Sequence, residues 1–324
     1  MSRARLAMLF PGQGSQYPQM ARDVLRCATG RSLLGQAEDV SGLPLTDLMS
    51  TADAATLAHP AVAQLSVLVH SLALVDQLAA QGVRPDVVAG HSLGEYTAMA
   101  AAGMLDRPTA LSLVARRGQA MAEAARSRPG AMGAVVGLDA QRVQQMCDAV
   151  DGLVVLANIN SPRQVVVSGS PEPVEAVLSA ARGAGALRAK TLRVGGAYHS
   201  PLMAPAAATM TAAWADVVLA PPRCTFVSST SGALVTDPAA QASAMRRQVG
   251  APVRWATTMA AVTAAGVAAV VEVGPGRVLA GLAREQAPGL PQLLLRPGVP
   301  VAWPPAGHDG ERVSGGTLAA AVAR

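Results

Sequence analysis

Aromatic residues are scarce in this chain of 324 residues, at 2% of the total. So few aromatic rings argue against a surface that stacks the bases of single-stranded nucleic acid. The hydrophobic content of 51% must therefore come from Ala, Val, Leu and Met, which have to build the core. Together with a charged content of only 15%, this composition indicates a folded globular protein rather than a disordered one.

Cysteine is also rare, with Cys27, Cys147 and Cys224 widely spaced and in no Cys-x-x-Cys pattern. This predicts neither a disulfide framework nor a structural zinc site, and free thiols fit a reducing compartment. The apolar run near the N-terminus, residues 6–10, is too short for a signal peptide. We further expect no uncharged stretch of membrane-spanning length, so the sequence predicts a cytoplasmic protein without membrane association.

Lysine occurs once, at Lys190, so nearly all of the 26 basic residues are arginines. The arginines are scattered, with short pairs at 116–117 and 246–247, and they form no stripe typical of a nucleic-acid-binding protein. An arginine-rich surface suits an acidic partner or a phosphate-bearing substrate. A solvated surface with biased arginine usage explains the same composition, so both interpretations stay open.

The most informative stretch is residues 90–96, with the sequence GHSLGEY. It follows an apolar run at 86–89 and precedes the helix-prone segment 97–102, which predicts a strand, a sharp turn and a helix. A Gly-x-Ser-x-Gly turn needs small residues on both sides of its strained backbone. The hydroxyl of Ser92 would then lie at a helix N-terminus, where free N–H groups can hold a developing oxyanion. This predicts a nucleophilic serine; the alternative is an incidental serine in a Gly-rich turn.

Two long helices are predicted on either side of this turn. The helix at 60–80 is apolar nearly all round and should be buried. The helix at 108–125 has one apolar face, with Arg117 about 60° and Arg116 about 160° from its centre. Arg116 should meet solvent, and Arg117 should lie at the margin of the buried side. An inward guanidinium needs an anionic partner, either a structural carboxylate or a substrate anion.

The order of elements predicts an α/β fold in two parts. Residues 1–129 and 199–324 should form a large α/β-hydrolase-like subdomain with a parallel sheet. Residues 130–198 read as strand-helix-strand-strand-helix-strand, which is typical of a ferredoxin-like α+β subdomain inserted in the larger one. We also expect a helix at 201–219, a surface wrap at 296–315 and a last short helix at 317–323.

A nucleophilic serine needs a base and oxyanion donors. His199 is the best-placed base, because it stands where the chain leaves the inserted subdomain at a natural cleft. His91 precedes the serine directly, but strand alternation should turn its side chain elsewhere. No aspartate presents itself as the third member of a triad, which disfavours an ordinary hydrolase.

An ordered set of motifs carries a family resemblance. The chain resembles malonyl-CoA:acyl-carrier-protein transacylases and the acyltransferase domains of polyketide synthases over about residues 6–295. Each motif alone is weak, but the set in this order and spacing is highly specific. The motifs are FPGQGSQ at 10–16, GHSLG at 90–94, Arg117-Gly118, NINSPRQ at 158–164, YHS at 198–200 and EVGPG at 272–276.

The resemblance implies roles for the matched residues. Ser92 would take the acyl group from coenzyme A, with His199 as general base and then general acid. The backbone N–H groups of Gln13 and Leu93 would form the oxyanion hole, and Arg117 would clamp the free carboxylate of malonyl. Bidentate geometry is the reason for arginine there.

The same resemblance implies the reaction partners. The acyl group would pass from malonyl-CoA to the phosphopantetheine thiol of an acyl carrier protein, in fatty-acid or polyketide biosynthesis. Coenzyme A enters as a thioester substrate, and neither a cofactor nor a metal is expected.

Two positions refine the resemblance. The family commonly has asparagine where this chain has Ala251, and in relatives that position helps to orient the histidine. If a main-chain carbonyl orients His199, alanine suffices; if the side chain does so, His199 is held less well. Tyr198 beside the substrate would crowd an added methyl group, which favours malonyl over methylmalonyl by about 10- to 200-fold.

Other functions remain open at this stage. The malonyl-loading subunit of malonate decarboxylase and a trans-acting acyltransferase for another acyl unit share this chemistry. An α/β-hydrolase thioesterase would share the serine turn, but it requires an acid partner for His199 and leaves Arg117 unexplained. A non-catalytic binding protein does not account for the serine, histidine and arginine together.

Overall fold

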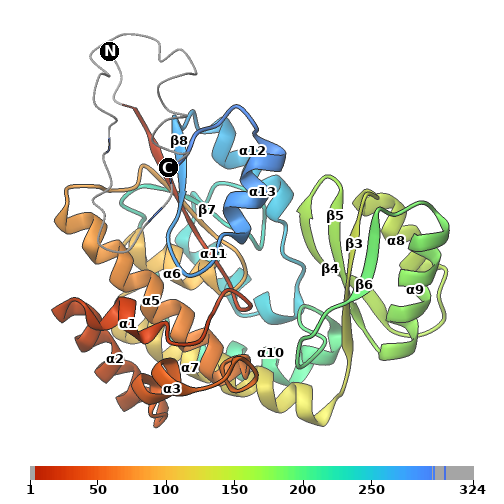
Figure 1. Ribbon diagram of the computed structural model, residues 1–324, viewed down its shortest axis with the longest axis horizontal. Coiled ribbons are helices and arrows are strands. Elements are labelled where there is room, and N and C mark those ends of the chain that lie inside the picture. Colours follow the sequence, from red (N-terminus) through yellow and green to blue (C-terminus); the bar gives the residue numbers. More distant parts are fainter. Residues whose placement is uncertain (1–3, 294, 296–302, 304–324) are drawn as a thin grey trace.

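The computed structural model describes residues 4–293, 295 and 303, and in it the chain forms two β-sheets with helices around each (Figure 1). The larger sheet has five parallel strands in the order β7-β2-β1-β8-β9. Its strands are β1 (Leu6–Phe10), β2 (Val87–Gly90), β7 (Thr225–Val227), β8 (Ala269–Glu272) and β9 (Gln292–Leu293).

Both faces of this sheet are covered, as the continuous apolar sequence of its strands requires. Along β1, Leu6, Met8 and Phe10 join the core with α2 (Ala28–Ser41), α5 (Pro60–Ala80), α6 (Gly94–Ala101) and α7 (Arg107–Ser127). Ala7 and Leu9 face the other way, toward α12 (Trp255–Ala264) and α13 (Val278–Gln286). Helices therefore pack on both faces of the sheet whose strand β2 leads into the serine turn.

Helix α5 is as long and as buried as the sequence predicts, with a proline in its first turn. The expectation that no stretch reaches membrane-spanning length was wrong, because α5 is long and apolar enough by that measure. However, 78% of its most apolar window is buried inside the fold. Its apolar surface is explained by packing against α2 and α7 in the core.

The smaller sheet has four antiparallel strands in the order β4-β5-β3-β6. Helices α8 and α9 cover its outer face, and its other face turns toward the large sheet (Figure 1). This is the βαββαβ arrangement of a ferredoxin-like unit, which together with the parallel sheet confirms the predicted fold class. The elements are β3 (Ala131–Val136), α8 (Ala140–Asp148), β4 (Val154–Ser161), β5 (Gln164–Gly169), α9 (Pro171–Gly183) and β6 (Arg188–Thr191).

Some expectations differ from the structure in detail. The helix predicted at 201–219 is a 3₁₀ turn, η1 (Pro201–Met203), followed by α10 (Ala204–Ala213), and helix α12 was not predicted. The predicted final helix at 317–323 lies outside the described residues, as does nearly all of the wrap predicted at 296–315. The remaining elements are α1 (Ala21–Leu25), α3 (Leu45–Thr51), α4 (Ala54–Leu57), α11 (Pro238–Met245) and η2 (Gln248–Gly250).

Candidate active site

Ser92 lies at the apex of the turn between β2 and α6, with a positive φ of 52°. A Cβ atom added at Gly90 would lie 1.9 Å from the carbonyl oxygen of Gly94, and one at Gly94 would lie 2.0 Å from that of Phe10. Both glycines are therefore required by close backbone approach. A strained serine on such a turn presents its hydroxyl outward, as expected for a nucleophile elbow.

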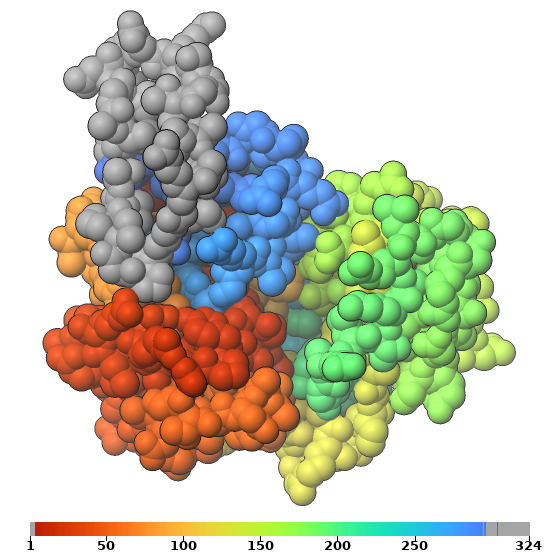
Figure 2. Space-filling view, in the orientation of Figure 1, coloured from red at the N-terminus to blue at the C-terminus, as the bar shows by residue number. Residues whose placement is uncertain are grey.

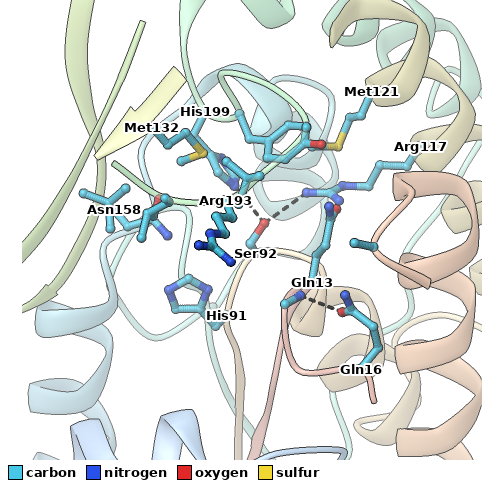
Figure 3. Close-up of a pocket in the computed structure, with 17 residues that line it drawn as sticks. Gln13, Gln16, His91, Ser92, Arg117, Met121, Met132, Asn158, Arg193 and His199 are labelled. Atoms are coloured by element: carbon cyan, nitrogen blue, oxygen red, sulfur yellow. Dashed lines mark hydrogen bonds between the residues drawn. The ribbon is translucent and has the colours of Figure 1, made fainter. Parts of the chain in front are cut away.

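His199 lies directly opposite Ser92, although 107 residues separate the two in the chain. Its Nε2 is 2.8 Å from the Oγ of Ser92 (Figure 3). Its Nδ1 is 2.8 Å from the carbonyl oxygen of Ala251 and 3.2 Å from that of Gln248. Carbonyls only accept hydrogen bonds, so Nδ1 carries the proton and Nε2 is free to accept the one from Ser92. His199 also has a positive φ of 58°, so both members of the pair are held in strained conformations.

The question raised by Ala251 is answered by these contacts. The histidine is oriented by main-chain carbonyls, which is the case in which alanine is expected to suffice. Among the described residues no carboxylate hydrogen-bonds to His199. Burial and the nearby charge of Arg117 lower the pKa of His199 to about 3. The imidazole is therefore neutral near pH 7, the state in which it can act as a base.

Arg117 is buried, at 1% exposure, while Arg116 is exposed, so the predicted helix orientation is confirmed. Its Nη2 donates to the Oγ of Ser92 at 3.1 Å, and Tyr96 lies under the guanidinium with its ring centre 5.7 Å away. No carboxylate lies within 4.0 Å of the guanidinium in the described part of the chain. The alternative of a structural carboxylate partner thus finds no support, and the Nε atom has no partner at all there.

Two glutamines hold the guanidinium instead. Nη1 donates to Gln64 at 2.7 Å, and Nη2 donates to Gln248 at 3.2 Å. Gln64 also donates to the side chain of Gln13 at 3.1 Å, which links Arg117 to the loop after β1. Sequence analysis missed both Gln64 and Gln248. A polar residue inside the otherwise apolar helix at 60–80 was the available signal for Gln64.

Ser92, His199 and Arg117 open into a cavity of about 190 Å³ between the two sheets. The space-filling view shows the molecule hollowed where the N-terminal helices face the small subdomain (Figure 2). Met132, Asn158 and Val166 supply the wall on the small-sheet side, and Gln13 and Tyr198 also line the cavity. Leu93 follows the serine as the buried N-cap of α6 and does not line the cavity. All the predicted site residues thus lie at or next to one cavity.

His91 is one of the residues that line this cavity, and its side chain is turned away from Ser92, as expected (Figure 3). Its Nε2 is 2.9 Å from the Oδ1 of Asn160, and its ring lies 5.5 Å from that of Trp255. Burial lowers the pKa of His91, which keeps it neutral. This contact ties the serine turn to strand β4 of the small sheet.

Comparison with known proteins agrees with this geometry. The acyl transferase domain family matches residues 7–287. Malonyl CoA-acyl carrier protein transacylase of Bacillus subtilis is 36% identical over 286 residues, which is 87% of this chain and 90% of that protein. The protein of the same name from Synechocystis is 38% identical over 88% of this chain and 95% of its own length.

Solved structures agree as well. The malonyl CoA-acyl carrier protein transacylase of Coxiella burnetii is similar with a TM-score of 0.86 and 33% identity, over 90% of this chain and 94% of that one. A malonyl-transacylase in complex with a type II polyketide synthase acyl-carrier protein is similar with a TM-score of 0.85 and 34% identity, over 90% and 96%.

Proposed function

Because this chain belongs to the acyl transferase domain family, we propose that it moves a malonyl group from coenzyme A to the phosphopantetheine thiol of an acyl carrier protein. One observation carries the proposal: the buried guanidinium of Arg117 is 3.1 Å from the Oγ of Ser92 and has no carboxylate within reach in the described structure. A buried guanidinium with no carboxylate paired directly to it invites an anionic substrate. The carboxylate of malonyl is such an anion, next to the thioester that the serine attacks.

In the first half-reaction, the neutral Nε2 of His199 takes the proton of Ser92 as Oγ attacks the thioester carbonyl. The tetrahedral oxyanion would be held by the backbone N–H groups of Gln13 and Leu93. The carbon–sulfur bond then breaks, and His199 returns the proton to the coenzyme A thiolate. The product is a malonyl ester on Ser92.

In the second half-reaction, His199 takes the proton of the phosphopantetheine thiol, and the thiolate attacks the ester. The carbon–oxygen bond breaks and Ser92 regains its proton. Arg117 would hold the malonyl carboxylate in both halves, and Tyr198 would wall the space beside the substrate's central carbon. Coenzyme A is a substrate here, and we propose that no further cofactor or metal takes part.

The partners of His199 Nδ1 also argue against the alternative of a thioesterase, because they are main-chain carbonyls and not a carboxylate. Hydrolases of this kind strengthen their histidine with a carboxylate, and His199 has only carbonyl partners among the described residues. A weaker base favours attack by a thiol, which gives up its proton more readily than water. A cytoplasmic location is part of the proposal, because Cys27, Cys147 and Cys224 are free thiols, which fit a reducing compartment.

Labelled malonyl-CoA tests the proposal directly. We expect stable label on the wild-type protein, none on Ser92→Ala, and transfer of the label to a holo acyl carrier protein. Offering a panel of purified carriers identifies the pathway and separates the malonate decarboxylase alternative. Rapid release of free malonate without a labelled protein would indicate a hydrolase instead.

A further inference from the structure

Glu95 is a fully buried carboxylate that the reaction above does not use. It lies three residues after Ser92, in the first turn of α6. Five side chains donate to its two oxygens, and a buried charge requires such complete satisfaction. The donors are Ser228 and Gln241 to Oε1, and Ser229, Thr230 and Gln248 to Oε2.

Gln248 differs from the other four donors because it reaches the reacting groups. Its Nε2 donates to Glu95 at 3.0 Å and to the carbonyl oxygen of Ser92 at 2.9 Å. Both of those partners can only accept, so the amide must turn its Nε2 toward them. Its Oε1 is then left to accept from Arg117, at 3.2 Å.

The main chain at the same position holds the base. The carbonyl oxygen of Gln248 accepts from His199 Nδ1 at 3.2 Å, and that of Val249 accepts from the backbone N–H of His199 at 3.1 Å. The turn η2 therefore contacts His199, while the Gln248 side chain contacts Ser92 and Arg117. Glu95 is the group that fixes this side chain from the buried side.

We propose that Glu95 is a positioning residue that sets the orientation of the Gln248 amide, and through it the arrangement of Ser92, Arg117 and His199. It touches no substrate and acts only through Gln248. This inference rests on the proposed function, because its effect is read in acylation of Ser92.

The variant Glu95→Gln tests the inference with almost no change of shape. An amide at position 95 keeps one acceptor oxygen but puts a donor NH2 group where two or three of the five donors need an acceptor, so the hydrogen-bond network that fixes Gln248 is broken. We expect the rate of acylation by saturating malonyl-CoA to fall about 10- to 100-fold. Glu272→Gln is the matched control: Glu272 is also a buried carboxylate, but it accepts from the backbone of α13 and does not line the cavity. Its acylation rate should stay within about 2-fold of wild type.

A double-variant comparison separates positioning from a general structural role. Gln248→Met keeps the length of the side chain and the main-chain carbonyl but removes the amide. If Glu95 acts through Gln248, adding Glu95→Gln to this variant lowers the rate by less than about 2-fold further. The inference would be overturned if the fold-loss of the double variant equalled the product of the losses of the two single variants. A wild-type rate in Glu95→Gln would also overturn it.

If Glu95→Gln does not fold, the single variant Gln248→Met still tests the inference. It should also lower the acylation rate about 10-fold or more, and a wild-type rate would again contradict the inference. Failure of the proposed function is distinguishable, since in that case the wild-type protein would not be labelled by malonyl-CoA at all.

Discussion

The two sheets of this molecule face the same cavity but contribute differently to it. The strands of the parallel sheet are buried on both faces, and the turn after β2 carries the nucleophile. The small sheet buries one face under α8 and α9 and gives only a wall of Met132, Asn158 and Val166 to the cavity. The rigid, doubly covered sheet thus holds the reacting groups, and the antiparallel sheet shapes the space beside them.

Loss of His199 should give the largest effect. His199→Ala removes the imidazole that hydrogen-bonds to Ser92 as its base, and we expect acylation to fall about 10²- to 10⁴-fold. Single-turnover labelling with malonyl-CoA measures this loss, with the exposed His59→Ala as the control. A residual rate above about a tenth of wild type would mean that another base serves the serine.

Arg117→Ala should be next and should discriminate between substrates. The malonyl rate is expected to fall about 10²- to 10³-fold, because a desolvated carboxylate loses its charge-assisted partner. Acetyl transfer should be retained or increase. Arg116→Ala is the matched control, since that neighbouring side chain is exposed. Equal loss of both substrates would assign Arg117 to structure rather than to recognition.

The pH dependence of the free energy of unfolding should reveal that His199 and His91 are held in the neutral form near Ser92. The folded-state pKa of His199 is lowered to about 3 and that of His91 is lowered as well, so the unfolded chain takes up protons first as the pH falls. Stability should therefore be complete above about pH 6.5 and decline below it, by about 1.4 kcal/mol per pH unit for each such histidine. Urea unfolding from pH 7 to pH 4 checks this. The decline should be shallower in His199→Gln, and an unchanged slope would contradict the assignment.

Changes in the small-sheet wall should have smaller effects on the reaction. Val166→Ala enlarges the cavity and should raise KM for malonyl-CoA by less than about 10-fold, with little change in kcat. Val165→Ala is the control, because that side chain faces the opposite core and should cost stability without changing KM. If Val166→Ala lost as much kcat as Arg117→Ala, the small sheet would also position the reacting groups, and the two sheets would not differ in role.

Ala251→Asn should have the smallest effect. The carbonyl oxygen of Ala251 orients His199, and the carbonyl is present whatever the side chain. We expect kcat/KM to change by less than about 2-fold. A clear gain in rate would indicate that an asparagine side chain adds to the orientation of the histidine.

Local features of the sequence determined much of this protein. Gly90 specifies a tight turn, because a Cβ atom there would lie 1.9 Å from the carbonyl oxygen of Gly94. The periodicity of α7 determined that Arg117 points inward and Arg116 outward. The alternation of elements determined the ferredoxin-like unit. Each of these depends only on residues near one another in the chain.

Other features were decided only by the tertiary structure. The partners of His199 are a serine 107 residues before it and two carbonyls about fifty residues after it, and no local pattern pairs them. Gln64 and Gln248 come to Arg117 from α5 and η2, and Glu95 accepts from five side chains between positions 228 and 248. Such contacts depend on how the helices pack on the sheets. The sequence therefore determined the nucleophile and the inward arginine, and packing decided which groups orient them.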